Sequence, residues 1–430
     1  MTVEARVDLS AIRDNVRWLR TRTRADVMGM VKADGYGHGL VASGWAALAG
    51  GATWLGTAFL TEALSLRDAG IAAPVLSCMV SADDDLVTAV RAGVDLSLSG
   101  RGVLAATVTA ARSVRLPARI HLEVDTGMGR GGVVPGADWE HMLAEVAHAA
   151  AEGLVRVVGI WTHLACADEP DHPANARQLA NYAEALRVAD RLGVRPEVRH
   201  AANSPATLRL PDAHFDVVRL GAAIYGLSPF PEAVLELTPA MVLAARVSAL
   251  ATGDGPPTDR PNGADPSHGA DQSNGATRPN GVDQAHGAGQ PNGAEPSHGT
   301  GQPHGAEPSD SAGRPDGMGG TGAAGRWRAV SPLGYGDGVP SEAGDVVDAW
   351  LGGARCRIVQ PVLMNQSSVA VADHAVAVGD RITYFGSGDG QPTANEWATA
   401  LHTDPREITS RVGARVPRVY LHPELIGPPS

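Results

Sequence analysis

The chain is organised around Val31-Lys-Ala-Asp-Gly-Tyr-Gly-His-Gly39. Lys32 is the only lysine in the sequence, and the other side chains with a permanent positive charge are all arginines, which cannot act as amine nucleophiles. The apolar run before Lys32 predicts a buried strand, and the glycines that follow it favour a tight turn. A lysine in this setting suits a carbonyl cofactor held through a Schiff base. The alternative is a surface lysine beside a loop.

On both sides of this turn, short apolar runs alternate with alanine-rich helical stretches. About eight strand–helix units predict a (β/α)₈ barrel, in which the reacting groups lie at the carboxyl ends of the strands. Lys32, Arg130, His163, Ser204 and Arg219 all fall at or just after such expected ends. The expected barrel strands are 25–32, 54–57, 74–78, 94–98, 119–125, 157–163, 197–200 and 217–220. The expected helices are 40–50, 61–69, 82–92, 100–113, 137–152 and 174–192, preceded by a strand at 3–8 and a helix capped by Asp8 or Ser10 that runs to about residue 22.

The pattern changes near residue 235. Short β-like runs with Gly and Pro punctuation predict a mostly antiparallel β domain, which the N-terminal strand is expected to join. We expect a barrel at 1–234 and a β domain at 235–251 plus 326–430, with its strands near 238–251, 345–350, 356–362, 368–371 and 381–385 and a tail at 404–420.

The stretch 252–325 differs in composition from the rest of the chain. Asn-Gly and His-Gly pairs recur there at a hexapeptide period, and large apolar side chains are nearly absent. Such a period can indicate a β-helix, but that fold needs an apolar residue to bury in each turn. The composition favours a disordered low-complexity insert. Loose metal binding by the spaced histidines is the less favoured alternative.

Bulk properties exclude several functional classes. The 430 residues carry a net charge of −12 without a basic stripe, which argues against nucleic acid as a partner. Cys78, Cys166 and Cys356 match no metal or disulfide spacing, so we expect free thiols in a reducing compartment. The charged N-terminus predicts no signal peptide, and no apolar run is long enough to span a membrane. A soluble cytoplasmic protein is therefore expected.

Six sequence blocks occur in a fixed order: VKADGYGHG at 31–39, VDTGMGRGG at 124–132, THLACAD at 162–168, HAANSPA at 200–206, VRLGAAIYG at 218–226 and GYGDG at 334–338. They closely resemble the motifs of alanine racemases, whose usual first block is KADAYGHG. The resemblance covers about residues 3–250 and, more weakly, 326–420. It implies pyridoxal 5′-phosphate as the cofactor, an amino acid as the substrate, and a homodimer with shared active sites.

The resemblance also implies two proton carriers. Lys32 matches the lysine that binds the cofactor, and its freed amine can act as a base on one face of the substrate's α-carbon. Tyr335 matches the family's catalytic tyrosine, which reaches the lysine of the other subunit. Without the resemblance, the alternative interpretation of Tyr335 is a structural tyrosine in a hairpin turn.

Further matches concern the cofactor. Arg219 matches the arginine that faces the pyridine nitrogen, and this permanent cation favours proton return over other fates of the carbanion. The alternative is a surface arginine with an acidic neighbour. For the phosphate, the resemblance points to Tyr36, Ser204 and the backbone N–H groups of Gly221 and Ala222. His163 and His200 match histidines beside the ring, and of these we expect His163 to take part.

The substrate side departs from the family pattern. Arg130 matches the arginine near the substrate carboxylate, and many relatives steady it with a carbamylated lysine seven residues earlier. That position is Glu123 here, and we hypothesise that its carboxylate replaces the carbamate. Met364 matches a substrate-side residue, but the family's Cys-Met-Asp-Gln block reads Leu363-Met-Asn-Gln366, which removes a carboxylate. The family's second phosphate tyrosine aligns with Arg406, which could bind phosphate equally well.

The sequence and the resemblance therefore predict a racemase that converts L-alanine to D-alanine with pyridoxal 5′-phosphate, for D-alanine biosynthesis. One alternative is the same scaffold acting on another amino acid, or catalysing aldol-type cleavage. The other is a non-catalytic protein that only binds the cofactor, which would not need Tyr335.

Overall fold

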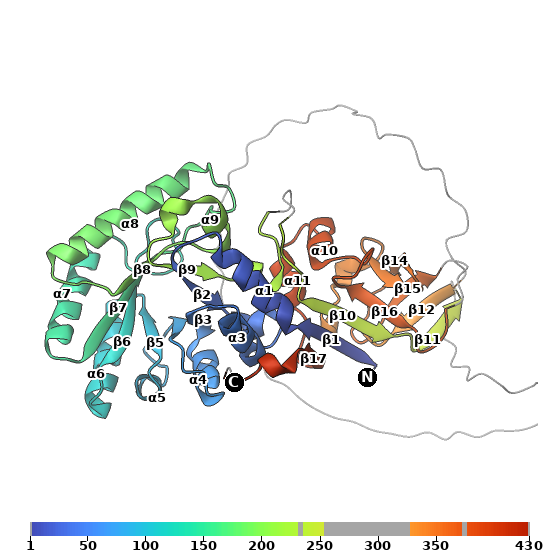
Figure 1. Ribbon diagram of the computed structural model, residues 1–430, viewed down its shortest axis with the longest axis horizontal. Coiled ribbons are helices and arrows are strands. Elements are labelled where there is room, and N and C mark those ends of the chain that lie inside the picture. The colour runs from blue at the N-terminus through green and yellow to red at the C-terminus, as the bar shows by residue number, and fades with distance from the viewer. Residues whose placement is uncertain (1, 231–234, 253–326, 372–375, 429–430) are drawn as a thin grey trace, which may run out of the picture. The chain divides into compact units, whose positions relative to one another are not determined.

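The computed structural model describes residues 2–230, 235–252, 327–371 and 376–428. These residues form an eight-stranded parallel barrel and a nine-stranded sheet (Figure 1). The predicted fold class, a (β/α)₈ barrel with a mostly antiparallel β domain, is confirmed. The barrel and the sheet belong to one compact unit, and the predicted domain boundaries stay predictions. The predicted insert lies outside the described residues apart from Thr252.

The barrel strands follow the order β8-β7-β6-β5-β4-β3-β2-β9, and each paired neighbour is parallel. Between β8 and β9, the Arg219 N–H donates to the Ala202 carbonyl at 2.9 Å and the Asp216 N–H donates to the Arg199 carbonyl at 3.0 Å. The carboxyl ends of the strands therefore meet at one end of the barrel. The strands are β2 (Asp26–Met30), β3 (Trp54–Phe59), β4 (Val75–Met79), β5 (Asp95–Leu98), β6 (Ala118–Glu123), β7 (Val155–Trp161), β8 (Val198–His200) and β9 (Val217–Leu220).

Helices connect these strands and cover the outside of the barrel (Figure 1). In the helix before β7, Trp139, Met142, Leu143 and Val146 recur at helical spacing and are fully buried, so this helix packs one apolar face on the strands. The connecting segments are the left-handed turn α2 (Lys32–Tyr36) and the helices α3 (Leu40–Ala49), α4 (Leu60–Asp68), α5 (Leu86–Arg91), α6 (Arg101–Val114), α7 (Ala137–Ala151), α8 (Pro173–Arg191) and α9 (Ser204–Arg209), with 3₁₀ turns η1 (Pro211–Ala213) and η2 (Ala222–Tyr225).

The nine-stranded sheet has the order β11-β12-β15-β14-β13-β16-β10-β1-β17. Only the β1–β17 pair is parallel among its described pairs. The strands are β1 (Val3–Asp8), β10 (Met241–Arg246), β11 (Ala249–Thr252), β12 (Trp327–Ser331), β13 (Asp348–Leu351), β14 (Ala354–Val359), β15 (Ser367–Val371), β16 (Arg381–Phe385) and β17 (Arg418–Leu421). The short helices here are η3 (Tyr335–Asp337), η4 (Ser341–Ala343), α10 (Ala394–Ala400), α11 (Pro405–Ser410) and η5 (Pro423–Leu425).

Helix α1 (Leu9–Arg20) leads from the sheet into the barrel. The Asp8 carboxylate accepts hydrogen bonds from the backbone N–H groups of Ser10 at 2.8 Å and Ala11 at 3.2 Å. Asp8 is thus the N-cap, one of the two that the sequence allowed. Among the described residues, no helix is both long enough and apolar enough to cross a membrane.

Local differences from the predicted elements have physical reasons. The run at 238–251 is two strands, β10 and β11, that pair with different neighbours. Strand β13 begins later than predicted, because Asp345 has a φ of 61° that an extended strand does not allow. The tail at 404–420 contains α11, whose N-cap Asp404 and first residue Pro405 are recognisable start signals. The predictions missed α10 as well.

Candidate active site

Lys32 follows directly from the carboxyl end of β2, at the entrance to a left-handed turn. Ala33, Asp34 and Tyr36 have φ values of 53°, 52° and 53°, a region that costs non-glycine residues about 1 kcal/mol or more each. Such strain persists only when the surroundings hold it in place, and it is typical of functional sites. The predicted tight turn is therefore present, but it does not depend on glycine alone.

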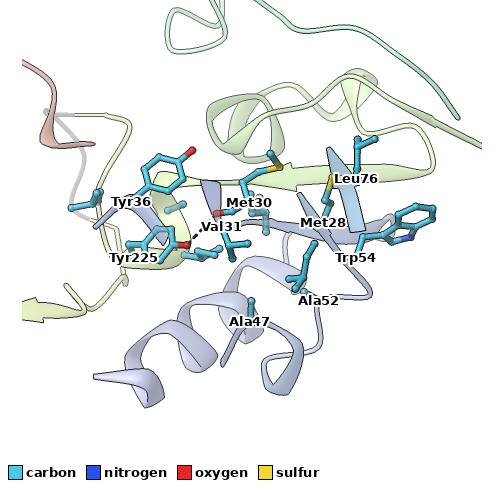
Figure 2. Close-up of a cluster of buried hydrophobic side chains, with 14 of the residues drawn as sticks. Met28, Met30, Val31, Tyr36, Ala47, Ala52, Trp54, Leu76 and Tyr225 are labelled. Atoms are coloured by element: carbon cyan, nitrogen blue, oxygen red, sulfur yellow. Dashed lines mark hydrogen bonds between the residues drawn. The ribbon is translucent and has the colours of Figure 1, made fainter. Parts of the chain in front are cut away.

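Side chains from neighbouring elements hold this turn. The Glu62 carboxylate of α4 accepts the Ala33 N–H at 2.7 Å, and the Asp34 carboxylate accepts the Leu40 N–H at 2.8 Å. Behind the turn, the Tyr225 hydroxyl donates to the Met30 carbonyl at 3.1 Å within a buried cluster (Figure 2). The end of β2 and the residue after Lys32 are thus fixed from separate elements, which positions the amine.

The segment from α11 onward covers the outer side of the turn. A side chain at Gly37 would collide with the Thr409 carbonyl, and Gly37 itself has a φ of 86°. The Arg418 guanidinium donates to the Gly37 carbonyl at 2.8 Å and 3.0 Å. At least one of the glycines in the turn is therefore needed for the close approach of the C-terminal segment, rather than for the approach of a ligand.

The ε-amino group of Lys32 makes no hydrogen bond or ion pair among the described residues. Burial lowers the pKa of Lys32, and the positive charges of Arg130, Arg406 and Arg219 lower it further, while the Cys78 thiol opposes them. A lowered pKa increases the neutral, nucleophilic fraction of the amine. The arrangement therefore provides an unpaired amine that can form a covalent bond to a carbonyl group.

Hydrogen-bond donors without acceptors gather around the Gly221 backbone. The Gly221 N–H donates to Ser204 Oγ at 3.0 Å, and no acceptor for the Ser204 hydroxyl or the Ala222 N–H occurs among the described residues. A side chain at Gly221 would collide with the Tyr36 hydroxyl. Burial raises the pKa of Tyr36 to about 12, so its phenol stays a neutral donor. The structure thus brings together the predicted phosphate-binding residues, although the Gly221 N–H already has an acceptor.

Arg219 lies inside the barrel and is only 4% exposed. Its guanidinium donates to His200 Nδ1 at 3.1 Å, to the Thr162 carbonyl at 2.9 Å, to the Ala201 carbonyl at 3.0 Å, and to His163 Nδ1 at 3.3 Å. Burial lowers the pKa of Arg219 to about 10, which leaves it charged at neutral pH. Its Nε–H and one Nη1–H have no acceptor among the described residues, so Arg219 can still donate to a ligand.

Glu123 and Arg130 line one small cavity together with Thr162 and His163. Burial raises the pKa of Glu123 to about 7, and the charges of Arg130 and Arg219 oppose this rise. No hydrogen bond or ion pair joins Glu123 to Arg130. The structure therefore places both at the site as predicted, within electrostatic reach of each other but without direct contact.

Tyr335, Leu363 and Met364 lie together on the surface of the sheet part of the chain. Their side chains are 49%, 50% and 54% exposed, and the Tyr335 N–H donates to the Leu363 carbonyl at 2.9 Å. The cavity beside Tyr335 is lined by Gly338, Pro340, Ser341, Glu342 and Arg411 and by none of the barrel residues around Lys32. Among the described residues, no hydrogen bond, ion pair or shared cavity joins Tyr335 or Met364 to Lys32.

Asn365, which stands where the family pattern has an aspartate, is contacted by an arginine. Arg415 donates twice to Asn365 Oδ1 at 3.0 Å and forms an ion pair with Asp337 at 2.8 Å. The amide oxygen still accepts the guanidinium, so the loop that carries Met364 keeps its tie to the turn that carries Tyr335. What the substitution removes is one negative charge beside Arg415.

Sequence reasoning missed two features of the site. Cys78 stands near the end of β4, and its thiol acts electrostatically on Lys32 and Arg219; its position at a strand end was the available signal. Glu62 was missed because a surface glutamate on a helix carries no distinguishing pattern.

Comparisons with known proteins agree with this geometry. Residues 7–229 match the family model described as alanine racemase, N-terminal domain, and residues 317–420 match that described as alanine racemase, C-terminal domain. An alanine racemase of Thermobifida fusca is 44% identical over 420 residues, which cover 97% of each chain. Solved alanine racemases from Streptomyces coelicolor A3(2) and from a D-cycloserine-producing Streptomyces lavendulae are each 37% identical with a TM-score of 0.79; they cover 98% of this chain and 98% and 97% of their own.

Proposed function

The chain belongs to the alanine racemase family, and from this premise we propose that it interconverts L- and D-alanine with pyridoxal 5′-phosphate bound at Lys32. The enzyme class, an amino-acid racemase, follows from the family. The observation that carries the finer proposal is the unpaired amine of the only lysine, whose pKa is lowered by burial and by three arginines.

The donors beside Lys32 suit the cofactor's phosphate. Tyr36, Ser204 and the Ala222 N–H offer hydrogen bonds that no described residue accepts, and Arg406 adds a positive charge that acts on Tyr36 and Lys32. Lys32 would hold the aldehyde carbon, Arg219 would donate to the ring nitrogen, and His163 would lie beside the ring. When bound, the cofactor withdraws electrons from the α-carbon of an attached amino acid and so makes its hydrogen acidic.

Arg219 would influence which reaction the bound cofactor supports. A guanidinium has only donors and keeps its proton, so it can hold the ring nitrogen by a hydrogen bond without transferring a proton to it. A ring nitrogen left unprotonated would withdraw less charge than a protonated one, so Arg219 would favour return of the proton to the α-carbon. This supports racemisation over aldol-type cleavage.

Two residues would carry the proton on opposite faces of the α-carbon. Lys32 Nζ, whose pKa is lowered by burial and by three arginines, would accept or return the proton on one face. Tyr335 of the partner subunit does so on the other face, in a homodimer with shared sites. The exposed apolar group of Tyr335, Leu363 and Met364 supports this assembly, because a second copy would cover it.

Arg130, Glu123 and Met364 would define the substrate side. The Arg130 guanidinium is exposed to the cavity and has no ion-pair partner among the described residues, which leaves it available for a carboxylate. Glu123 would orient it by charge, and Met364 of the partner subunit would contact the substrate. A cytoplasmic location and domain boundaries at 1–234, 235–251 and 326–430 complete the proposal.

The proposal is tested by incubating the purified protein with L-alanine and pyridoxal 5′-phosphate in deuterated water. We expect deuterium at the α-carbon together with loss of optical activity. Exchange with another L-amino acid but not with alanine would assign a different substrate. Cofactor uptake without any exchange would leave only a binding protein.

Arg406→Ala is expected to weaken pyridoxal 5′-phosphate binding about tenfold or more, because a hydrogen bond to a charged group contributes on the order of 1.5–3 kcal/mol. The Arg406 guanidinium now donates to both Asp404 oxygens, with Nε 2.7 Å from Oδ1. Asp404→Asn removes the negative charge and the acceptor for Nη2, so it should free part of the guanidinium and tighten binding, while the asparagine oxygen still caps α11. Titration of the cofactor-free protein measures both. Equal dissociation constants for all three proteins would remove Arg406 from the site.

Glu123→Gln is expected to lower kcat/KM for alanine about fivefold, the effect of losing about 1 kcal/mol of charge interaction, and also to stabilise the cofactor-free protein at alkaline pH. The pKa of Glu123 rises on folding from 4.5 to about 7, chiefly through burial, so the folded state binds the proton more tightly. The free energy of unfolding of the wild type therefore falls as pH rises from 4.5 to about 7, and above that range the wild type remains destabilised by the buried charge of Glu123.

Glutamine stays uncharged and avoids this destabilisation. The Tm of Glu123→Gln should therefore exceed that of the wild type by more at about pH 8 than at about pH 5. A gain independent of pH would contradict the raised pKa. Unchanged kinetics would contradict the role of Glu123 in orienting Arg130.

A further inference from the structure

A row of buried polar side chains crosses the barrel interior and ends at Arg219. Arg219 Nη1 lies 3.1 Å from His200 Nδ1, and His200 Nε2 lies 2.9 Å from His121 Nδ1. His121 Nε2 faces Asp95 Oδ2 at 3.6 Å. Asp95 accepts the Arg119 guanidinium on both of its oxygens. Asp95, His121 and His200 are fully buried, and none of them has a role in the proposed proton transfer.

The donors in this row can be arranged in only one way. Arginine donates and never accepts, so His200 Nδ1 must be bare and its proton must lie on Nε2. That N–H then donates to His121 Nδ1, which must also be bare. The proton of His121 lies on Nε2 and faces the Asp95 carboxylate. Burial, reinforced by Arg219 and then His121, lowers the pKa of His200 well below its ordinary value, which agrees with a neutral ring.

Neighbouring backbone and aromatic side chains pack closely against both rings. A side chain at Gly159 would collide with the His121 ring, so β7 approaches this ring closely. The edge of Trp54 packs on His121, with ring centroids 5.7 Å apart and an interplanar angle of 81°. Trp161 lies parallel to His200 with centroids 5.7 Å apart. In this packing, the order of donors is given by which ring nitrogen carries the proton.

We propose that Asp95 and His121 are positioning residues for racemisation: they fix the proton on the outer nitrogen of His200, so that its bare nitrogen faces and holds Arg219. This inference rests on the proposed function, in which Arg219 donates to the cofactor's ring nitrogen. A proton on His121 Nδ1 would place two N–H groups against each other. His200 would then have to turn an N–H toward Arg219, and the guanidinium would lose this hold.

Asp95→Asn tests the row from its far end. Arg119 can only donate, so the oxygen of the new asparagine amide must face Arg119. The NH₂ group of that amide then faces His121 Nε2. That nitrogen must then be bare, which moves the proton to Nδ1 and opposes the N–H of His200. We expect kcat to fall about tenfold with KM within about twofold, together with a changed absorbance spectrum of the bound cofactor.

The matched control is Asp216→Asn. Asp216 accepts Arg199 on both oxygens at 2.7 Å and 3.0 Å, the same geometry in the same barrel, but no histidine continues from it. This variant should keep kcat and the spectrum. Equal losses in Asp216→Asn and Asp95→Asn would show a general effect of ion pairs and overturn the proposal.

His121 is replaced in two ways. Asparagine can keep an acceptor near the place of Nδ1, whereas phenylalanine keeps the ring without one and strands the buried N–H of His200. His121→Asn should retain kcat within about twofold and His121→Phe should lose about tenfold. His121→Phe should also have the lower Tm, because it leaves the buried His200 N–H without an acceptor. The opposite order, or no difference, would overturn the proposal.

Carbon-13 NMR of labelled histidine in the full chain shows the proton positions directly. We expect the Nε2–H form at His121 and His200 in both cofactor-free and loaded protein. A proton on Nδ1 of His121 or His200 would contradict the proposed order of donors. The row is present without cofactor, so the NMR result tests the proton positions independently of the proposed function. The proposed function fails if the wild type neither binds pyridoxal 5′-phosphate nor exchanges the α-hydrogen.

Discussion

Lys32→Ala is expected to lose covalent attachment of pyridoxal 5′-phosphate and to lose racemisation by on the order of 10⁴-fold or more, since it removes both the attachment point and one proton carrier. No second lysine exists to compensate. The change should leave the fold intact, because the amine makes no hydrogen bond or ion pair among the described residues. Absorbance of the bound cofactor and α-deuterium exchange measure the two losses.

Lys32→Arg is the matched control. Arginine keeps a positive charge at this position but cannot act as an amine nucleophile, so it should be as inactive as Lys32→Ala. If Lys32→Arg retained the absorbance of attached cofactor, the charge and not the amine would hold the cofactor, and the role assigned to Lys32 would be wrong.

Tyr335→Phe is expected to retain attached cofactor and to lose racemisation by about 10²–10⁴-fold, the usual contribution of a positioned acid or base. The phenol is half-exposed in the single chain, so its removal should not affect Tm. Because Lys32 would still serve one face, one enantiomer of alanine should exchange its α-hydrogen with retention of configuration. Exchange from both enantiomers at the wild-type rate would show that Tyr335 does not carry the proton.

Mixed dimers of Lys32→Ala and Tyr335→Phe subunits test whether the sites are shared. If each site combines Lys32 of one subunit with Tyr335 of the other, a mixed dimer holds one intact site and one doubly defective site. It should regain about half the activity of the wild-type dimer. If both residues came from the same chain, every site would carry one defect and no activity would return.

Much of the barrel site was predictable because strand–helix alternation carries its own geometry. Once the strands are predicted, their parallel order places Lys32, Ser204 and Arg219 at the same end of the barrel. Their side-chain chemistry then marks them as candidates for the site. Cys78 obeys the same rule, but a lone thiol gives no reason to choose it. Tyr335 was predicted only through its motif, because the order of strands and helices does not relate it to Lys32.

The remaining features depend on contacts that a sequence does not record. Ala33 and Asp34 are left-handed because Glu62 and Leu40 hold the turn, whereas sequence reasoning assigns such conformations to glycine. His121 and Asp95 lie within predicted strands, where a polar residue normally indicates a solvated face. Their partners are 79 and 24 residues away, so only the closed barrel shows that they form a row.

The central claim is that the amine of Lys32 holds the cofactor, and the most direct measurement is the position of that attachment. The full chain is loaded with pyridoxal 5′-phosphate, reduced with borohydride and digested, and the modified peptide is identified by mass spectrometry. The account predicts one label per chain, on Lys32. Because the N-terminal α-amino group is the only other primary amine in an unmodified chain of this sequence, a label there, or no label at all, would contradict it.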